Sequence, residues 1–227
     1  MLRSIRALLA HPTVKRLLAN KEAFTAAVLY GGTAFHFLYG VFRLVSGAFS
    51  YDAYVDTASF FYLQLALNRL VLIRALHTKA EGAVRGDSVR MALRTSGVLL
   101  LLTGVTVFPL VAATVRGERL SSYPRYVVFA SAAYAVYSLI SALTDIRLLH
   151  RAGRPLLSAS RAVVLTASAV SAFTFLIDLL FTIKDTVPSL RRLFILVGGL
   201  LTLSVAVGLG LRLLLLSRSV EEKLPPS

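Results

Sequence analysis

The chain has 227 residues, of which 56% are hydrophobic and 16% are charged. Soluble domains carry about 25% charged residues, so this composition excludes an ordinary soluble protein and indicates a membrane domain. The 25 Lys and Arg residues outnumber the 11 acidic residues and give a net charge of +14, and there is no cysteine. Disulfides, thiol nucleophiles and cysteine-ligated metals are therefore excluded.

Residues 1–22 form a basic amphipathic segment before the first apolar stretch. Aliphatic side chains recur at helical spacing against Arg and Lys, and Pro12 interrupts the pattern. Such a segment suits a short helix lying in the membrane interface. An ordinary cytosolic lead-in explains the same pattern equally well.

Six stretches of about 20 apolar residues follow, which is the length that a transmembrane helix needs. They make residues 23–216 one all-α, polytopic membrane bundle. Residues 217–227 form a polar tail that we expect to be disordered. The predicted spans cover residues 24–47, 54–76, 93–114, 124–146, 160–182 and 192–215.

Small residues recur in the last two spans, in pairs four apart in the fifth. Such residues mark faces where membrane helices approach one another closely. The pairs in the fifth span are Ala167 with Ser171 and Ser168 with Ala172, and the sixth span has Gly199, Gly208 and Gly210. We therefore expect these positions to serve helix packing.

Two of the spans share their beginnings and their ends. Each opens on Tyr-x-x-Tyr-Val and closes on Ile-Arg-x-Leu-His, and the sixth span ends on a fainter copy of the closing motif. The pattern predicts three repeated helical hairpins related by an axis along the membrane normal. Chance similarity among apolar helices is the alternative. The shared positions are Tyr51, Tyr54, Ile73, Arg74, Leu76 and His77, then Tyr123, Tyr126, Ile146, Arg147, Leu149 and His150.

The distribution of the basic residues predicts the orientation of the bundle. With both termini placed in the cytoplasm, most Lys and Arg residues fall in the inner segments and few fall in the outer loops. This is the positive-inside bias of membrane proteins, and basic inner loops also suit anionic lipid. We therefore predict cytoplasmic N- and C-termini and no nucleic-acid partner.

Two ionisable residues lie at similar depths within predicted spans. Arg43 lies about one turn from the outer end of the first span, and Asp178 lies at a similar depth in the fifth. Ionisable groups inside a membrane are costly and often functional, so we predict an intramembrane ion pair between them. The alternatives are an Arg43 side chain that extends to the outer interface and an Asp178 side chain that reaches outer water.

A second predicted polar cluster consists of His36, Gln64 and Asn68. Gln64 and Asn68 are four residues apart on one helix face, and an antiparallel hairpin sets His36 level with Gln64. One interpretation is a polar lining for a substrate or a proton path. The other is a hydrogen-bonded clamp between helices worth about 1 kcal/mol. Arg69 adjoins the cluster, and we expect its side chain to extend toward the inner interface.

Enzyme signatures do not occur in the chain. There is no His-Glu-x-x-His, Gly-x-Ser-x-Gly, Gly-x-Gly-x-x-Gly or P-loop sequence. The acidic residues fall mostly in loops and provide no convincing acid–base pair. We therefore predict a non-enzymatic protein with no catalytic residue, cofactor or metal site.

One block of sequence carries a resemblance to a known group of proteins. The run YAVYSLISALTDIRLLHRAGRPLLSASRAVVLTASAVSAF, with LYGVFRLVSGAFSYDAY more loosely, resembles uncharacterised bacterial six-helix membrane proteins. The three-hairpin layout is also similar to that of HdeD-like membrane proteins, at the level of architecture only. The resemblance implies a six-helix fold in a bacterial cytoplasmic membrane and brings no known activity or site residues.

These observations leave two classes of function. The first is a structural, accessory or stress-related membrane protein that acts in the lipid bilayer, with a membrane-protein partner or as a homo-oligomer. The second is a small transporter or channel for an ion or a small solute. The second class needs a continuous polar path, for which His36, Gln64, Asn68, Arg43 and Asp178 are the candidates. The sequence favours the first class.

Overall fold

The computed structural model of the protein describes residues 21–50, 53–80, 85–116, 125–149, 155–183 and 187–221. This part of the chain forms six helices, so the prediction of an all-α, six-helix fold is confirmed. They are α3 (Lys21–Ser50), α4 (Ala53–Ala80), α5 (Arg85–Arg116), α6 (Arg125–Leu149), α7 (Pro155–Thr182) and α8 (Pro188–Glu221).

The structure describes only the last two residues of the first predicted segment, and its last helix extends into the predicted tail. Residues 1–20 of the predicted interfacial segment lie outside the described residues. The predicted tail was to begin at residue 217, but α8 continues through Glu221. The apolar run Leu213–Leu216 lies directly before the predicted tail, and the polar residues that follow it extend the helix past the apolar span.

Proline fixes the starts of the last two helices. Pro155 is the first residue of α7 and Pro188 is the first residue of α8. The proline ring sets a backbone angle that suits the first helical turn, where the missing N–H has no intrahelical partner to lose.

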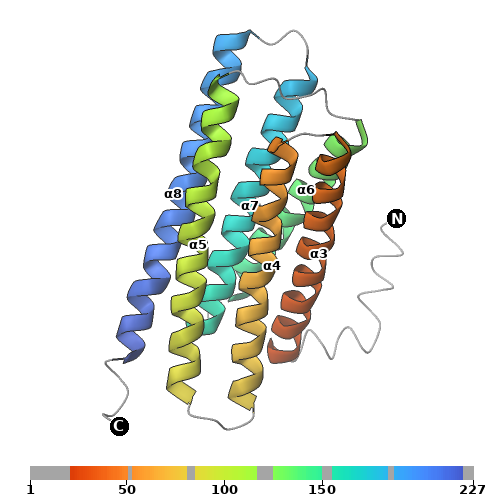
Figure 1. The fold of residues 1–227 in the computed structure, drawn as a ribbon. Coiled ribbons are helices and arrows are strands. Elements are labelled where there is room, and N and C mark those ends of the chain that lie inside the picture. The colour runs from red at the N-terminus through yellow and green to blue at the C-terminus, as the bar shows by residue number, and fades with distance from the viewer. Residues whose placement is uncertain are drawn as a thin grey trace.

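The six helices run roughly antiparallel to their chain neighbours and form two layers (Figure 1). Helices α8, α5, α4 and α3 follow one another across one layer, and α7 and α6 lie behind them. Helix α7 packs against α4, α5, α6 and α8 and is the central helix. In its span 67% of the residues are buried, against 28% in α8. Helix α3 begins and α8 ends at the same end of the bundle (Figure 1).

Four of the described helices are long and apolar enough to cross a membrane: α4, α5, α7 and α8. In α3 the polar residues His36 and Arg43 interrupt the apolar run, and the described apolar stretch of α6 extends only from Val128 to Ala142. Large apolar side chains point outward around the bundle, including Phe49, Phe108 and Phe129, which are each at least two thirds exposed. An apolar exterior of this kind fits lipid rather than water, and together with the four long apolar helices it indicates a chain that sits in a lipid bilayer.

Helices α5 and α8 approach one another through glycine. A Cβ atom built at Gly97 would lie 3.0 Å from the carbonyl oxygen of Gly210, and one built at Gly210 would lie 3.0 Å from that of Gly97. Gly199 of α8 also faces α5, because a Cβ atom there would overlap with Val111. The packing role predicted for Gly199 and Gly210 is confirmed. Gly208 differs, since a Cβ atom at this position would meet nothing within 4 Å.

Candidate functional site: a buried polar core

Arg43 of α3 and Asp178 of α7 meet inside the bundle. The Nη2 atom of Arg43 lies 3.3 Å from Oδ1 and 3.4 Å from Oδ2 of Asp178. Both side chains are fully buried, so neither reaches the outer interface or outer water as the alternatives required. The structure therefore places the two residues at the same depth and in contact, on helices that are far apart in the sequence.

Three tyrosine rings fill the space next to this ion pair. Tyr39 of α3, Tyr62 of α4 and Tyr134 of α6 are buried, with ring centroids between 4.2 and 4.9 Å apart. The hydroxyl of Tyr62 makes a 2.7 Å hydrogen bond with Oγ1 of Thr174 on α7. The rings thus join four helices, and the Arg43 guanidinium carbon lies 6.0 Å from the Tyr39 centroid, within range of a cation–π contact.

The tyrosines were not among the predicted site residues. The sequence contains one signal that points to them, because Tyr39 precedes Arg43 by four residues and the two therefore share a helix face. A tyrosine one turn from an intramembrane arginine offers both a ring and a hydroxyl to the charge.

His36 bonds to a tyrosine rather than to the predicted partners. Its Nδ1 atom lies 3.0 Å from the Tyr134 hydroxyl on α6. Its Nε2 atom is buried and has no hydrogen-bond partner among the described residues. Gln64 donates to the carbonyl oxygen of Leu99 at 2.7 Å, and Asn68 donates to that of Ser96 at 3.3 Å.

The structure therefore does not bring His36, Gln64 and Asn68 into one hydrogen-bonded cluster. The physical reason is the direction in which α4 presents its side chains. Each residue advances a helix by about 100°, so Gln64 points about 200° away from Tyr62. Tyr62 faces α3, α6 and α7, whereas Gln64 and Asn68 face α5.

Arg69 is buried and does not extend to an interface. Its side chain is 1% exposed, and its guanidinium lies against the backbone of α3 at Gly32. A Cβ atom at position 32 would overlap with the guanidinium, so this arginine needs a glycine here. The expectation that Arg69 extends toward the inner interface is wrong. The position of Arg69 along α4 gives its depth, but it does not show that Gly32 of the neighbouring helix α3 leaves room for the side chain.

Together these residues form a column of polar side chains along α3, which we call the polar column. It runs from Arg43 and Asp178, past the three tyrosines and His36, to Arg69 at Gly32. The 11 positions from Gly32 to Arg43 span about 16 Å of helix, roughly half the thickness of a bilayer core. The column contains groups that exchange protons, but aromatic rings occupy its middle. Among the described side chains no group of three His, Asp or Glu residues lies together to hold a metal ion.

Comparisons with known proteins do not identify a family for this chain. No family model matches it, and no curated protein matches its sequence. The resemblance to bacterial six-helix membrane proteins therefore stays a prediction from the residues quoted above. The fold establishes an all-α protein of six described helices, four of which are long and apolar enough to cross a membrane.

Proposed function

We propose that this chain is a non-enzymatic integral membrane protein with a structural or accessory role. The observation that carries this proposal is the filled interior of the polar column. The rings of Tyr39, Tyr62 and Tyr134 pack against one another between Arg43 and His36. A solute path along α3 would have to pass through these rings.

The contacts of the predicted polar residues also support a structural role. Arg43 pairs with Asp178, His36 bonds to Tyr134, and Gln64 and Asn68 bond to backbone carbonyls of α5. Each contact joins two different helices. Buried polar contacts of this kind specify which helix faces which, because an incorrect arrangement would leave a charge alone in the apolar interior.

The proposal includes a bacterial cytoplasmic membrane, six spans in three hairpins and cytoplasmic termini. The positive-inside bias supports the orientation. The pairing of Tyr62 with Tyr134 supports the repeat, because these residues are the same number of positions apart as Tyr51 and Tyr123. Reporter fusions to both ends of the chain, scored for cytoplasmic or exported activity, test the orientation. An exported amino end would contradict it.

A second function, transport of a proton or a small ion, has one observation in its favour. His36 has a buried ring nitrogen without a hydrogen-bond partner among the described residues, and it lies in the same column as Asp178. Proton-exchanging groups inside a membrane often mark transport paths. Movement of the tyrosine rings would have to open this path.

Flux measurements separate the two functions. The full chain is reconstituted into liposomes that contain a pH-sensitive dye, and proton flux is compared with that of protein-free liposomes. The accessory role predicts equal flux in both. Flux above the protein-free level would overturn the accessory role if Asp178→Asn abolishes it while Asp87→Asn, at an exposed position in the first turn of α5, retains it.

A further inference from the structure

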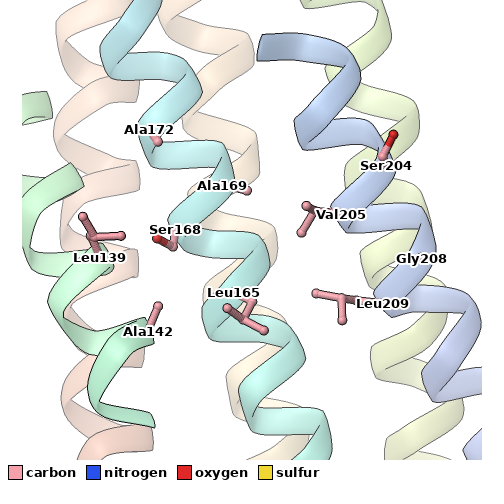
Figure 2. Close-up of a pocket in the computed structure, with 10 residues that line it drawn as sticks. All are labelled: Leu139, Ala142, Leu165, Ser168, Ala169, Ala172, Ser204, Val205, Gly208 and Leu209. Carbon is pink, nitrogen blue, oxygen red and sulfur yellow. The ribbon is translucent and has the colours of Figure 1, made fainter. Parts of the chain in front are cut away.

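A groove with an apolar lining runs between α6 and α8 along the outer side of α7 (Figure 2). Its volume is about 610 Å³. Small side chains of α7 form the floor, with larger side chains of α6 and α8 on either side (Figure 2). The lining residues used below are Ser168 and Ala172 on α7, and Ser204 and Gly208 on α8.

The small residues of this groove do not serve packing between the described helices. Ala172 and Ser204 are exposed, and a Cβ atom built at Gly208 would meet nothing within 4 Å. By contrast, Ala167 and Ser171 on another face of α7 are each 1% exposed. The prediction that Gly208 serves packing within the chain is thus wrong. Each of the two helices instead turns a pair of small residues, four positions apart, toward the groove, which is the pattern at which membrane helices approach closely.

Ser168 places a polar group in this groove. Its side chain is 9% exposed, and its hydroxyl has no hydrogen-bond partner among the described residues. Ser171 shows the arrangement that Ser168 lacks, because its hydroxyl donates to a backbone carbonyl of the same helix at 3.0 Å. A buried hydroxyl without a partner costs free energy. The occupant of the groove should therefore offer Ser168 a hydrogen-bond acceptor.

The depth of Ser168 shows what kind of occupant can do so. Ser168 lies 13 positions after the first residue of α7 and 14 positions before its last, which is about 20 Å from each end. The hydrocarbon core of a bilayer is about 30 Å thick, so Ser168 lies near its middle. Acyl chains carry no hydrogen-bond acceptor at this depth. A transmembrane helix does, through its backbone carbonyls and its serine hydroxyls.

Ser204 is such an acceptor at the same depth. The Thr202 hydroxyl of α8 donates to the Ala169 carbonyl oxygen of α7 at 3.5 Å, which sets these two residues level with one another. Ser168 and Ser204 therefore differ in depth by less than one helical turn. The Ser204 hydroxyl donates to the carbonyl oxygen of Leu200 at 2.8 Å, so its own oxygen can still accept a hydrogen bond.

We propose that the groove binds α8 of a second copy of this chain, with the Ser168 hydroxyl donating to Ser204 of that copy. A twofold axis along the membrane normal leaves every residue of the second copy at its own depth, so Ser168 of each copy meets Ser204 of the other. One patch thus carries both the donor and the acceptor, as contact between identical copies requires. Helix α8 suits this position, because it is the least buried of the four candidate spans and lies at the end of its layer (Figure 1). The inference rests on the membrane location of the chain and not on its accessory role.

The exposed Arg212 of α8 does not oppose this arrangement. It follows Ser204 by eight positions, which is about 12 Å along the helix and close to the edge of the hydrocarbon core. From there a long basic side chain reaches the head groups and water. Ions screen the repulsion between the two copies of Arg212 at that level.

Energy transfer between labelled copies in liposomes tests the proposal. Full chains that carry a donor or an acceptor dye at the C-terminus are mixed, and lipid is added to dilute them. For the wild type, the transfer should fall with dilution along a curve for a monomer and a dimer in equilibrium. A chain whose groove holds acyl chains would show only the transfer expected from random encounters.

Paired serine variants test the hydrogen bond. Symmetry gives the dimer two bonds between Ser168 and Ser204. Ser168→Ala should therefore weaken association about eightfold, which corresponds to about 1.2 kcal/mol for two such bonds between membrane helices. Ser204→Ala should have the same effect. The double variant should be no weaker than either single variant, because each of these already removes both bonds.

Glycine variants test the shape of the groove. Gly208→Leu fills the groove and should abolish association. Gly31→Leu on α3, at another glycine with nothing within 4 Å of its Cβ position, should leave association unchanged. The groove is open in a single chain, so neither the serine variants nor Gly208→Leu should change thermal unfolding at dilutions where the chain is monomeric. Circular dichroism verifies this.

Cysteine cross-linking shows which face the dimer uses. The chain has no cysteine, so one introduced cysteine per copy allows a single disulfide between copies. Leu201 lies seven positions before Gly208 on the same face of α8, and Leu201→Cys should cross-link. Val105→Cys on α5 should not, although Leu201 and Val105 are 63% and 66% exposed.

Three kinds of result would overturn the proposal. The first is a chain that stays monomeric at every dilution, because the groove would then hold acyl chains. The second is a dimer that survives Gly208→Leu or cross-links through Val105→Cys, because it would use another face. The third is equal association of the wild type and Ser168→Ala. None of these readouts depends on flux, so failure here and failure of the accessory role are distinguishable.

Discussion

The two sides of the bundle hold their helices together by different means. Helices α5 and α8 meet through glycine, with the backbone of each close to that of the other at Gly97 and Gly210. Helices α3, α4, α6 and α7 instead surround an ion pair, three phenols and a histidine. Apolar side chains gain little by leaving lipid for a protein interior, so a membrane protein depends on close packing or on polar contacts. This chain uses close packing between α5 and α8 and polar contacts among α3, α4, α6 and α7.

The difference between the two sides has an energetic consequence. A glycine contact is weakened rather than lost when a methyl group is added, because the two helices need to separate by only a few tenths of an ångström to relieve contacts of about 3.0 Å. A buried ion pair fails abruptly, because removal of one partner leaves the other charge alone in a medium that solvates it poorly. The polar side should therefore be the more sensitive to a single conservative change.

Breaking the ion pair should give the largest effect. Asp178→Asn and Arg43→Gln should each cost about 3–5 kcal/mol of unfolding free energy, because each leaves a fully buried charge without its partner. The double variant should recover most of this loss, since no isolated charge remains. Denaturant unfolding in detergent and the yield of folded protein measure the effect.

The control for this cycle is Asp87→Asn, at an exposed carboxylate on α5. It should change stability by less than about 0.5 kcal/mol. Additive losses in the double variant would show that Arg43 and Asp178 act independently and would contradict the pairing.

Enlarging the glycine contact should give an intermediate effect. A Cβ atom at Gly210 would lie 3.0 Å from both the Gly97 carbonyl oxygen and the Leu101 Cγ atom. Gly210→Ala should therefore push α5 and α8 apart and cost about 1–3 kcal/mol. Gly208→Ala, two positions away with nothing within 4 Å, should cost nothing and serves as the control. Thermal unfolding measures both, and equal losses would show that the close approach of the two backbones does not matter.

The depth of each polar residue could be predicted from the sequence, because position along a helix converts directly to distance across the membrane. Arg43 and Asp178 were placed at one depth in this way, and they lie in contact. The six helices also follow from the apolar stretches, and prolines begin two of them.

The direction in which each residue points could not be predicted, because it depends on which helices are neighbours. His36 and Gln64 were expected to meet, yet α4 presents Gln64 to α5 and Tyr62 to the polar column. The burial of Arg69 depends on a gap at Gly32 of another helix. Gly208 resembles a packing glycine in the sequence, and only the arrangement of α6, α7 and α8 shows that it lines a groove.

Substitution of Gln64 should give the smallest effect. The size of this effect shows whether Gln64 belongs to the polar side of the bundle. Its amide donates to the carbonyl oxygen of Leu99, which also accepts a hydrogen bond from Thr103. Gln64→Leu removes the donor and leaves that acceptor bonded, so the loss should be about 0.6 kcal/mol, typical of polar contacts between membrane helices. Thermal unfolding beside Asp178→Asn measures the difference. A loss as large as that of Asp178→Asn would mean that Gln64 supports the polar column. The contact between α4 and α5 would then belong to the polar side of the bundle.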